Sequence, residues 1–194
     1  PYMDREVFVA IQKAIKSPET QRRPVVAFQP ATGGCGSSTI ALNVASALAN
    51  QFNRKVLLVD ADLRSSSLPF WFNHDAEPTI VQALEACDNL SEKLWKEMIW
   101  TDRGMDLLLT GRRRSGATPA FSSWDFLRML SFATRRYDSV IVDLPEVVDD
   151  VFGVIRERAD FKFIVCNPDR ISATMARRRI DEMEAGGAEV DEVT

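Results

Sequence analysis

The amino-acid sequence predicts an α/β domain in which helices cover both faces of a mostly parallel sheet, a three-layer architecture. Short apolar runs alternate with longer amphipathic segments along most of the 194 residues, a pattern typical of strand–helix–strand units. A glycine-rich loop, 31–38, joins the first apolar run to a segment of small residues. Two further apolar runs, 55–60 and 139–143, end in an aspartate. These three observations together favour a sheet that binds its ligand at the carboxyl ends of the strands.

The chain is expected to divide near residue 24. An amphipathic helix is predicted over 4–15, because apolar residues recur there at spacings of three and four. A polar linker with two prolines follows over 17–24. We therefore expect an N-terminal helix and linker over 1–24 and one domain over 25–194. The chain begins with Pro1 rather than an initiator methionine, so we expect it to be a fragment of a longer protein.

The domain is predicted to open with a strand over 25–28, a short apolar run suited to a buried position. The small residues of 39–49 predict a helix that lies close against the sheet. The same two patterns, short apolar runs for strands and helical apolar spacing for helices, justify the later elements. In chain order these are a strand at 55–60, helices at 79–87 and 90–100, a strand at 105–109, a helix at 124–135, strands at 139–143 and 161–166, a helix at 171–185, and the opening of a strand at 189–194.

Composition excludes several classes of function. Lys and Arg total 24 against 28 Asp and Glu, a net charge of −4, which excludes a strongly basic DNA-coating protein. Three isolated cysteines exclude a disulfide scaffold and a zinc knuckle and favour a reducing cytosol. A single histidine leaves no His-based metal site. The arginines at 177–179, with acids at 181, 182 and 184, predict a solvated, ion-paired helix face rather than a nucleic-acid surface. No apolar run approaches the roughly 20 residues of a membrane span.

The glycine-rich loop is the first candidate site. Glycines allow backbone N–H groups to curl around an anion, and the N-terminus of the following helix adds positive potential. The hydroxyls of Ser37, Ser38 and Thr39 can cap that helix or hold phosphate and magnesium. A tight strand-to-helix turn capped by serine is the alternative that the loop alone leaves open.

Acids at the ends of two strands are the second signal. Asp60 and Asp143 each end an apolar run, and Asp62 follows two residues after the first. An aspartate at the end of a buried strand is costly unless it is hydrogen-bonded or near a cation. Two such strands beside a glycine loop predict a site for magnesium and phosphate, with the metal approached through water.

In their order along the chain these motifs resemble the ParA/MinD superfamily of deviant P-loop ATPases, over about residues 25–194. Residues 33–39 resemble the deviant Walker A motif, 56–62 the second acidic motif and 137–145 Walker B, while 166–169 resembles a loop after a later strand in MinD-like members. The resemblance implies a P-loop NTPase fold with ATP and Mg²⁺ as cofactors.

The resemblance also implies roles for individual residues. The residues expected to bind the nucleotide are Gly33, Gly34, Cys35, Gly36, Ser37, Ser38, Thr39 and Asn167. The residues expected to hold the metal are Ser38, Asp60, Asp62 and Asp143, of which Asp60 and Asp143 are also the catalytic candidates.

The chain departs from the family motif K-G-G-x-G-K-[ST] at both lysines. Thr32 stands at the first, which in the family reaches across a dimer, and Ser37 stands at the second, which contacts the β- and γ-phosphates. Losing a transition-state cation can cost several kcal/mol. We therefore expect weak ATP binding, at most slow hydrolysis, and a homodimer, where one forms, that does not depend on nucleotide. Arg64 can supply a cation, although nothing in the sequence requires that role.

Three functional hypotheses remain. The TadZ/CpaE branch of pilus-assembly proteins looks closest, because its members replace the P-loop lysine with a small residue. The bacterial tyrosine kinases of capsule and exopolysaccharide export are the second, although the arginines of their E-x-x-R-x-x-R helix are replaced by Val9 and Gln12 and only Tyr2 and Tyr137 are present. An active kinase is therefore not expected. The third is a pseudo-ATPase scaffold that binds no nucleotide.

The resemblance also sets the expected partners and location. The partners would be proteins of a pilus, secretion or polysaccharide-export machine, with no specific nucleic acid. The expected location is the cytoplasm, at the inner face of the membrane or a cell pole, with membrane contact only through a partner or a missing segment.

Overall fold

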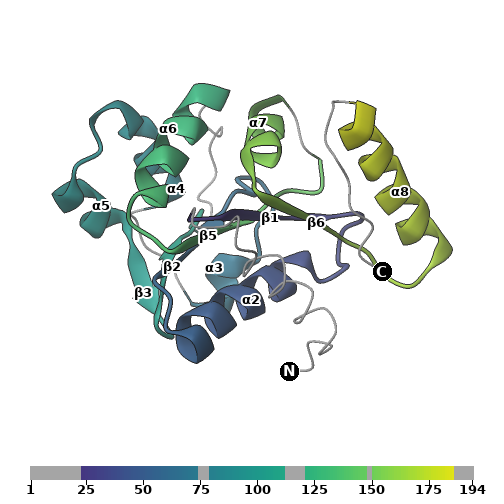
Figure 1. The fold of residues 1–194 in the computed structure, drawn as a ribbon, viewed down its shortest axis with the longest axis horizontal. Coiled ribbons are helices and arrows are strands. Elements are labelled where there is room, and N and C mark those ends of the chain that lie inside the picture. The colour runs from purple at the N-terminus through teal and green to yellow at the C-terminus, as the bar shows by residue number, and fades with distance from the viewer. Residues whose placement is uncertain (1–22, 74–78, 112–120, 148–149, 186–194) are drawn as a thin grey trace.

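The computed structural model describes residues 23–73, 79–111, 121–147 and 150–185. These residues form a six-stranded sheet in the order β3-β4-β2-β5-β1-β6 (Figure 1). Every strand pairing among them is parallel except that of β3 with β4, which confirms the predicted mostly parallel sheet. The strands are β1 (Val25–Pro30), β2 (Val56–Asp60), β3 (Trp100–Asp102), β4 (Met105–Leu108), β5 (Ser139–Asp143) and β6 (Phe161–Val165).

Helices cover both faces of the sheet, as predicted. The helices α2 and α3 lie on one face and α4, α5, α6 and α7 lie on the other, while α8 lies beside β6 at the end of the sheet (Figure 1). Their bounds are α2 (Ser37–Phe52), α3 (Leu68–Trp71), α4 (Ile80–Glu85), a 3₁₀ turn η1 (Cys87–Asn89), α5 (Glu92–Met98), α6 (Ser123–Thr134), α7 (Asp150–Arg158) and α8 (Arg170–Ala185).

Two hydrophobic clusters, one on each face, form the core. Successive residues of a strand point to opposite faces, so Val25 and Ala27 of β1 join the cluster under α4–α7. Val26 and Phe28 join the cluster under α2. The central strands are therefore buried on both faces, which explains why they read as continuous apolar runs.

The edge of the sheet corrects one prediction. The helix predicted over 90–100 ends at Met98, and Ile99 is already extended, with φ −89° and ψ 131°. Trp100 starts β3, which pairs antiparallel with β4. The turn between them consists of Arg103 and Gly104, both with positive φ, 49° and 78°, a conformation that suits a two-residue hairpin.

A buried polar chain joins the helical layer to the sheet. The indole Nε1 of Trp95 in α5 donates to the hydroxyl of Tyr137 at 3.1 Å. That hydroxyl donates to Oδ2 of Asp106 in β4 at 2.8 Å. Burial raises the pKa of Tyr137, which is 2% exposed, so the hydroxyl stays protonated and keeps both bonds.

The other predicted elements within the described ranges are confirmed to within a few residues. Sequence patterns did not predict α3, which has four residues, or α7, which has nine residues, includes Gly153 and carries charges at 150, 156, 157 and 158. The helix predicted over 4–15, the boundary near residue 24 and the strand at 189–194 lie wholly or partly outside the described residues.

Candidate functional site

The glycine loop between β1 and α2 is open on the side of its two left-handed glycines. Gly34 and Gly36 have φ of +77° and +91°, values that side chains other than glycine rarely adopt. A Cβ built at either position would meet no atom within 4 Å. The loop therefore has the shape of a backbone cradle with free space in front of it.

The start of α2 leaves polar groups available at this cradle. Gly36 caps the helix without any side-chain hydrogen bond, so the first N–H groups are not satisfied by a cap. The Ser37 hydroxyl is buried, with no hydrogen-bond partner. This result disfavours the simple alternative of a serine-capped turn, because neither Gly36 nor Ser37 supplies the capping bond.

A cavity of about 640 Å³ lies between the loop and the ends of β2 and β5, within the usual range for small-molecule sites. Three segments line it. They are residues 33–39 with Pro30, residues 62–67, and residues 143–147.

Asp143 is the acid of β5 at this cavity. It is 2% exposed, and its Oδ1 has no hydrogen-bond partner. Burial raises the pKa of this carboxyl to about 7, and the negative charges of Asp60 and Asp62 also raise it, while a hydrogen bond from Ser38 lowers it. Asp143 can therefore hold a proton near neutral pH and would exchange it for a cation.

Asp60 is in register with Asp143 on the neighbouring strand, but it does not line the cavity. Its Oδ2 accepts the Thr110 hydroxyl at 2.7 Å and the Thr110 N–H at 3.2 Å. Burial raises the pKa of Asp60 to about 6, against the lowering effect of bonds from Ser66 and Thr110. Its Oδ1, like Oδ1 of Asp143, is buried without a hydrogen-bond partner, and the charge of Asp60 also raises the pKa of Asp143.

The loop after β2 adds an acid and a cation. Oδ1 of Asp62 accepts the N–H groups of Arg64 and Ser65 at 3.1 and 2.9 Å, which folds a tight turn at the rim. Among the described residues that line the cavity, Arg64 alone carries a positive charge, and its side chain is exposed.

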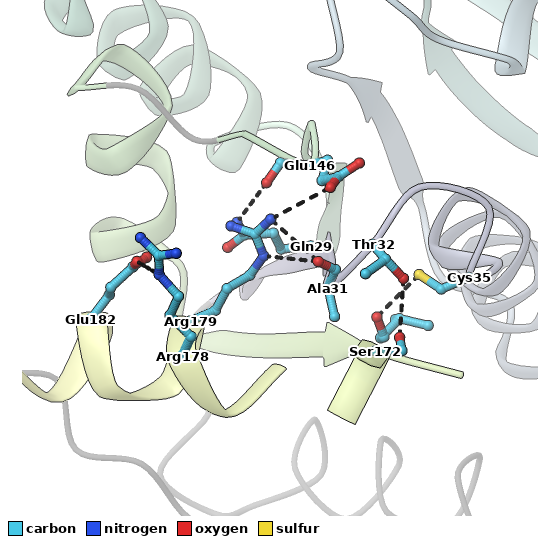
Figure 2. A network of polar contacts seen from close by, with 10 residues as sticks. Gln29, Ala31, Thr32, Cys35, Glu146, Ser172, Arg178, Arg179 and Glu182 are labelled. Atoms are coloured by element: carbon cyan, nitrogen blue, oxygen red, sulfur yellow. Dashed lines mark hydrogen bonds and ion pairs between the residues drawn. The ribbon is translucent and has the colours of Figure 1, made fainter. Parts of the chain in front are cut away.

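The root of the loop is fastened to β6 and α8 (Figure 2). The hydroxyls of Thr32 and Ser172 share a hydrogen bond of 3.0 Å. The Cys35 thiol donates to the carbonyl of Val165 at 3.1 Å. Arg179, 9% exposed, donates from Nε and Nη2 to the carbonyl of Ala31 at 3.4 and 3.3 Å. The side chain at the family's first lysine position is therefore bonded within its own subunit.

Glu146 closes the cavity on the side of β5. Its Oε2 lies 3.2 Å from the point where a Cβ on Gly33 would stand. Its backbone carbonyl accepts Nε2 of Gln29 at 3.4 Å, and its Oε1 is 4.0 Å from Nη2 of Arg179. Position 33 must therefore remain glycine unless this carboxylate moves.

The predicted site residues divide into two groups. Gly33 through Thr39, Asp62 and Asp143 line one cavity, as the motif order suggests. Asp60 and Asn167 do not line it. Asn167 follows β6, and its N–H donates to the Ser172 hydroxyl at 2.9 Å.

Sequence reasoning missed Glu146 and Arg179. The predicted ion pairs of Arg177 with Asp181 (2.8 Å) and Arg178 with Glu182 (3.1 Å) are present. Arg179, however, is buried against the loop. The available signal is its spacing from Ser172, Ala176 and Met183, the other buried residues of α8.

The residues present fit a phosphate with magnesium. Ser37 Oγ and Asp143 Oδ1 are buried polar atoms that lack partners, and such atoms normally bind something. No group of three acidic, cysteine or histidine side chains capable of holding a metal occurs within the described ranges. Ser38 and Asp143 would thus hold magnesium together with water and phosphate oxygens, as this ion prefers.

Comparison with known families identifies the family of this chain. The model of the ParA family, described as NUBPL iron-transfer P-loop NTPase, matches residues 21–192. The chain is 28% identical over 151 residues to the tyrosine-protein kinase ptk of Acinetobacter johnsonii. The aligned region covers 78% of this chain and 20% of that protein. The chain thus spans about a fifth of the length of this curated relative.

Solved structures share the architecture. The ParA family ATPase of Chlorobium tepidum TLS superposes with a TM-score of 0.75 at 24% identity, over 87% of this chain and 71% of that one. The kinase domain of the Escherichia coli tyrosine kinase ETK superposes with a TM-score of 0.69 at 22% identity, over 90% and 67% of the two chains. In the described part of the chain, no helix is both long and apolar enough to cross a bilayer.

Proposed function

Because the chain belongs to the ParA family of P-loop NTPases, we propose that its cavity binds a magnesium nucleotide through the phosphates, and that binding is weak. One observation carries the proposal. The backbone cradle and the unpartnered atoms of Ser37 and Asp143 are present, whereas the loop over 29–39 contains no lysine.

Each part of the site has a defined role in this proposal. The N–H groups of the loop and of the first turn of α2 bind phosphate oxygens. Ser38 and Asp143 hold the metal, which neutralises phosphate charge when it is bound. Burial, and after it the charge of Asp60, raises the pKa of Asp143, so proton loss from Asp143 would accompany metal binding.

Hydrolysis should be slow or absent. Charge that develops on a transferred phosphoryl group needs fixed cations, and each is worth a large factor in rate. Arg64 is exposed and the other charged residues that line the described cavity, Asp62, Asp143 and Glu146, are acids. The site is suited to holding a nucleotide rather than cleaving it.

We assign the domain to localisation or assembly of a pilus or secretion machine, as a degenerate ParA/MinD-type protein. The replacement of the motif lysine by Ser37 supports a TadZ/CpaE-like role. Thr32 is bonded to Ser172 inside its own subunit, so it would not reach a partner's nucleotide, and a homodimer, where one forms, would not depend on nucleotide.

A degenerate relative of the exopolysaccharide tyrosine kinases is the second candidate. The similarity to the tyrosine-protein kinase ptk favours it. Tyr137 is 2% exposed and bonded at its hydroxyl, so it is unsuited to accept phosphate in the folded domain. A phosphotyrosine blot of the full-length protein separates this candidate from the first.

Calorimetry with ADP-Mg and ATP-Mg tests the proposal. The parent should bind with magnesium and lose metal-dependent binding on Asp143→Ala. Asp102→Ala, on β3 at the far edge of the sheet, is the matched control and should bind like the parent. No heat of binding with either nucleotide would refute the proposal and favour the scaffold. Unchanged magnesium dependence in Asp143→Ala would refute the metal assignment.

A further inference from the structure

Glu146 places a fixed negative charge at the wall of the phosphate cavity. Its side chain is 44% exposed and lines the cavity, and Oε2 is the atom that faces Gly33. Gln29 holds the backbone of Glu146 from the sheet side at 3.4 Å. The backbone of Glu146 is therefore held by Gln29, and its half-exposed carboxylate lies at the cavity wall beside Gly33.

Arg179 approaches this carboxylate but does not line the cavity. The guanidinium donates to the Ala31 carbonyl behind the loop and approaches only Oε1 of Glu146, at 4.0 Å (Figure 2). Its side chain is 11% exposed and does not line the cavity. A ligand in front of the loop would therefore meet the carboxylate, while the arginine stays behind the loop.

The position of Glu146 identifies the phosphate that it would meet. The N–H groups at the start of α2 would hold the phosphates nearest to them, and magnesium held by Ser38 and Asp143 would neutralise phosphate charge at that side of the cavity. The chain passes from Asp143 to Glu146 in three residues and lines the cavity throughout. A chain of phosphates that begins at α2 and follows this wall would bring its third phosphate to Glu146.

We propose that Glu146 makes this cavity select a nucleoside diphosphate over the corresponding triphosphate. The inference rests on the proposed nucleotide binding and adds a ligand class to it. A diphosphate leaves the space beside Glu146 to water. The third phosphate of a triphosphate brings a like charge toward this carboxylate, with no lysine in the loop to offset it.

The test is the ratio of the dissociation constants for ATP-Mg and ADP-Mg, measured by calorimetry on the parent, Glu146→Gln and a control. Glu146→Gln keeps the size of the side chain and the backbone bond to Gln29, and Glu146→Ala is the second variant in case the first does not fold. Glu182→Gln removes an acid of α8 that pairs with Arg178 at the surface. The parent and the control should prefer ADP-Mg.

Glu146→Gln should lower the ATP-to-ADP ratio by about tenfold, which corresponds to about 1.4 kcal/mol of removed repulsion. A ratio unchanged in Glu146→Gln and Glu146→Ala, with both nucleotides bound, would overturn this inference and leave the proposed function standing. Absence of binding by the parent and every variant would refute the proposed function, and this inference with it.

Discussion

Ser37→Lys should restore much of the missing affinity for ATP. Ser37 is the first residue of α2, is 4% exposed and lines the cavity, and its hydroxyl has no partner. A lysine here replaces a hydroxyl that lowers the pKa of the neighbouring Asp143 carboxyl. Its stem can follow the cavity wall and bring the ammonium to the phosphates in front of the loop.

The size of the gain follows from one charged contact. A hydrogen bond to a charged group is worth about 1–3 kcal/mol, so the dissociation constant for ATP-Mg should fall by about 5- to 150-fold. The ammonium would also lie near Asp143, whose pKa of about 7 leaves it partly protonated at neutral pH. A nearby positive charge lowers that pKa, so metal binding should extend to lower pH in the variant.

Calorimetry at pH 7.5 with ATP-Mg measures the effect, with melting temperature as the check on folding. Ser37→Ala removes the same hydroxyl without adding charge and should bind ATP-Mg no more tightly than the parent. Thr32→Lys adds the charge at a side chain that is bonded to Ser172, so its gain should be smaller. A folded Ser37→Lys protein that binds no more tightly than Ser37→Ala would refute the reasoning.

Three further outcomes are expected. The pKa of Asp143 is raised in the folded state to about 7, so its contribution to stability is full below the unfolded pKa of about 3.9 and is lost as pH rises to about 7. Without nucleotide, Asp143→Asn should therefore be more stable than the parent at pH 8, by on the order of 1–3 kcal/mol, and about as stable as the parent at pH 4. Urea unfolding at both pH values measures the difference. Equal stability of the two proteins at pH 8 would contradict this prediction. ATP-Mg should not convert a monomer to a dimer in light scattering, because Thr32 lacks the positive charge that would reach the partner's nucleotide. A shift to a dimer that requires ATP would contradict this and favour an ATP-dependent dimer. Tyr137→Phe should cost about 1–2 kcal/mol in urea unfolding, because Trp95 and Asp106 both lose a buried partner; a cost near zero would show that water replaces the hydroxyl.

The backbone of the site could be predicted because local chemistry determines it. The glycine loop can fold around an anion only between a strand and a helix, and strands that end in aspartate meet at one edge of a parallel sheet. The register of Asp60 with Asp143 follows from that topology. These relations use short stretches of chain, which a single sequence contains in full.

The orientation of side chains could not be predicted in the same way. Asp60 does not line the cavity, and its Oδ2 is bonded to Thr110, fifty residues later. That contact depends on where β4 ends. Glu146 could not be identified because it lies just beyond the motif at 137–145 and its role depends on its position against Gly33.

Arg179 is an intermediate case. Three consecutive arginines look equivalent by composition, but a helix packed on a sheet has a buried face and an exposed face. Ser172, Ala176, Arg179 and Met183 lie at spacings of four, three and four and form the buried face of α8. Applying that periodicity to the arginines would have predicted one buried cation in need of a buried acceptor.

Because the glycine loop is bonded to α8, ligand binding at the loop and the docking of α8 are thermodynamically coupled. Any ligand whose binding changes the bonds of Thr32 and Ala31 to Ser172 and Arg179 must change the free energy of docking α8. By linkage, if the ligand changes the affinity of a partner for α8 by some factor, that partner changes the affinity for the ligand by the same factor. Two or three neutral and charge-assisted bonds limit this coupling to a few kcal/mol at most. A change in the hydrogen-exchange rates of the α8 amides on ligand addition would therefore show that the loop is occupied.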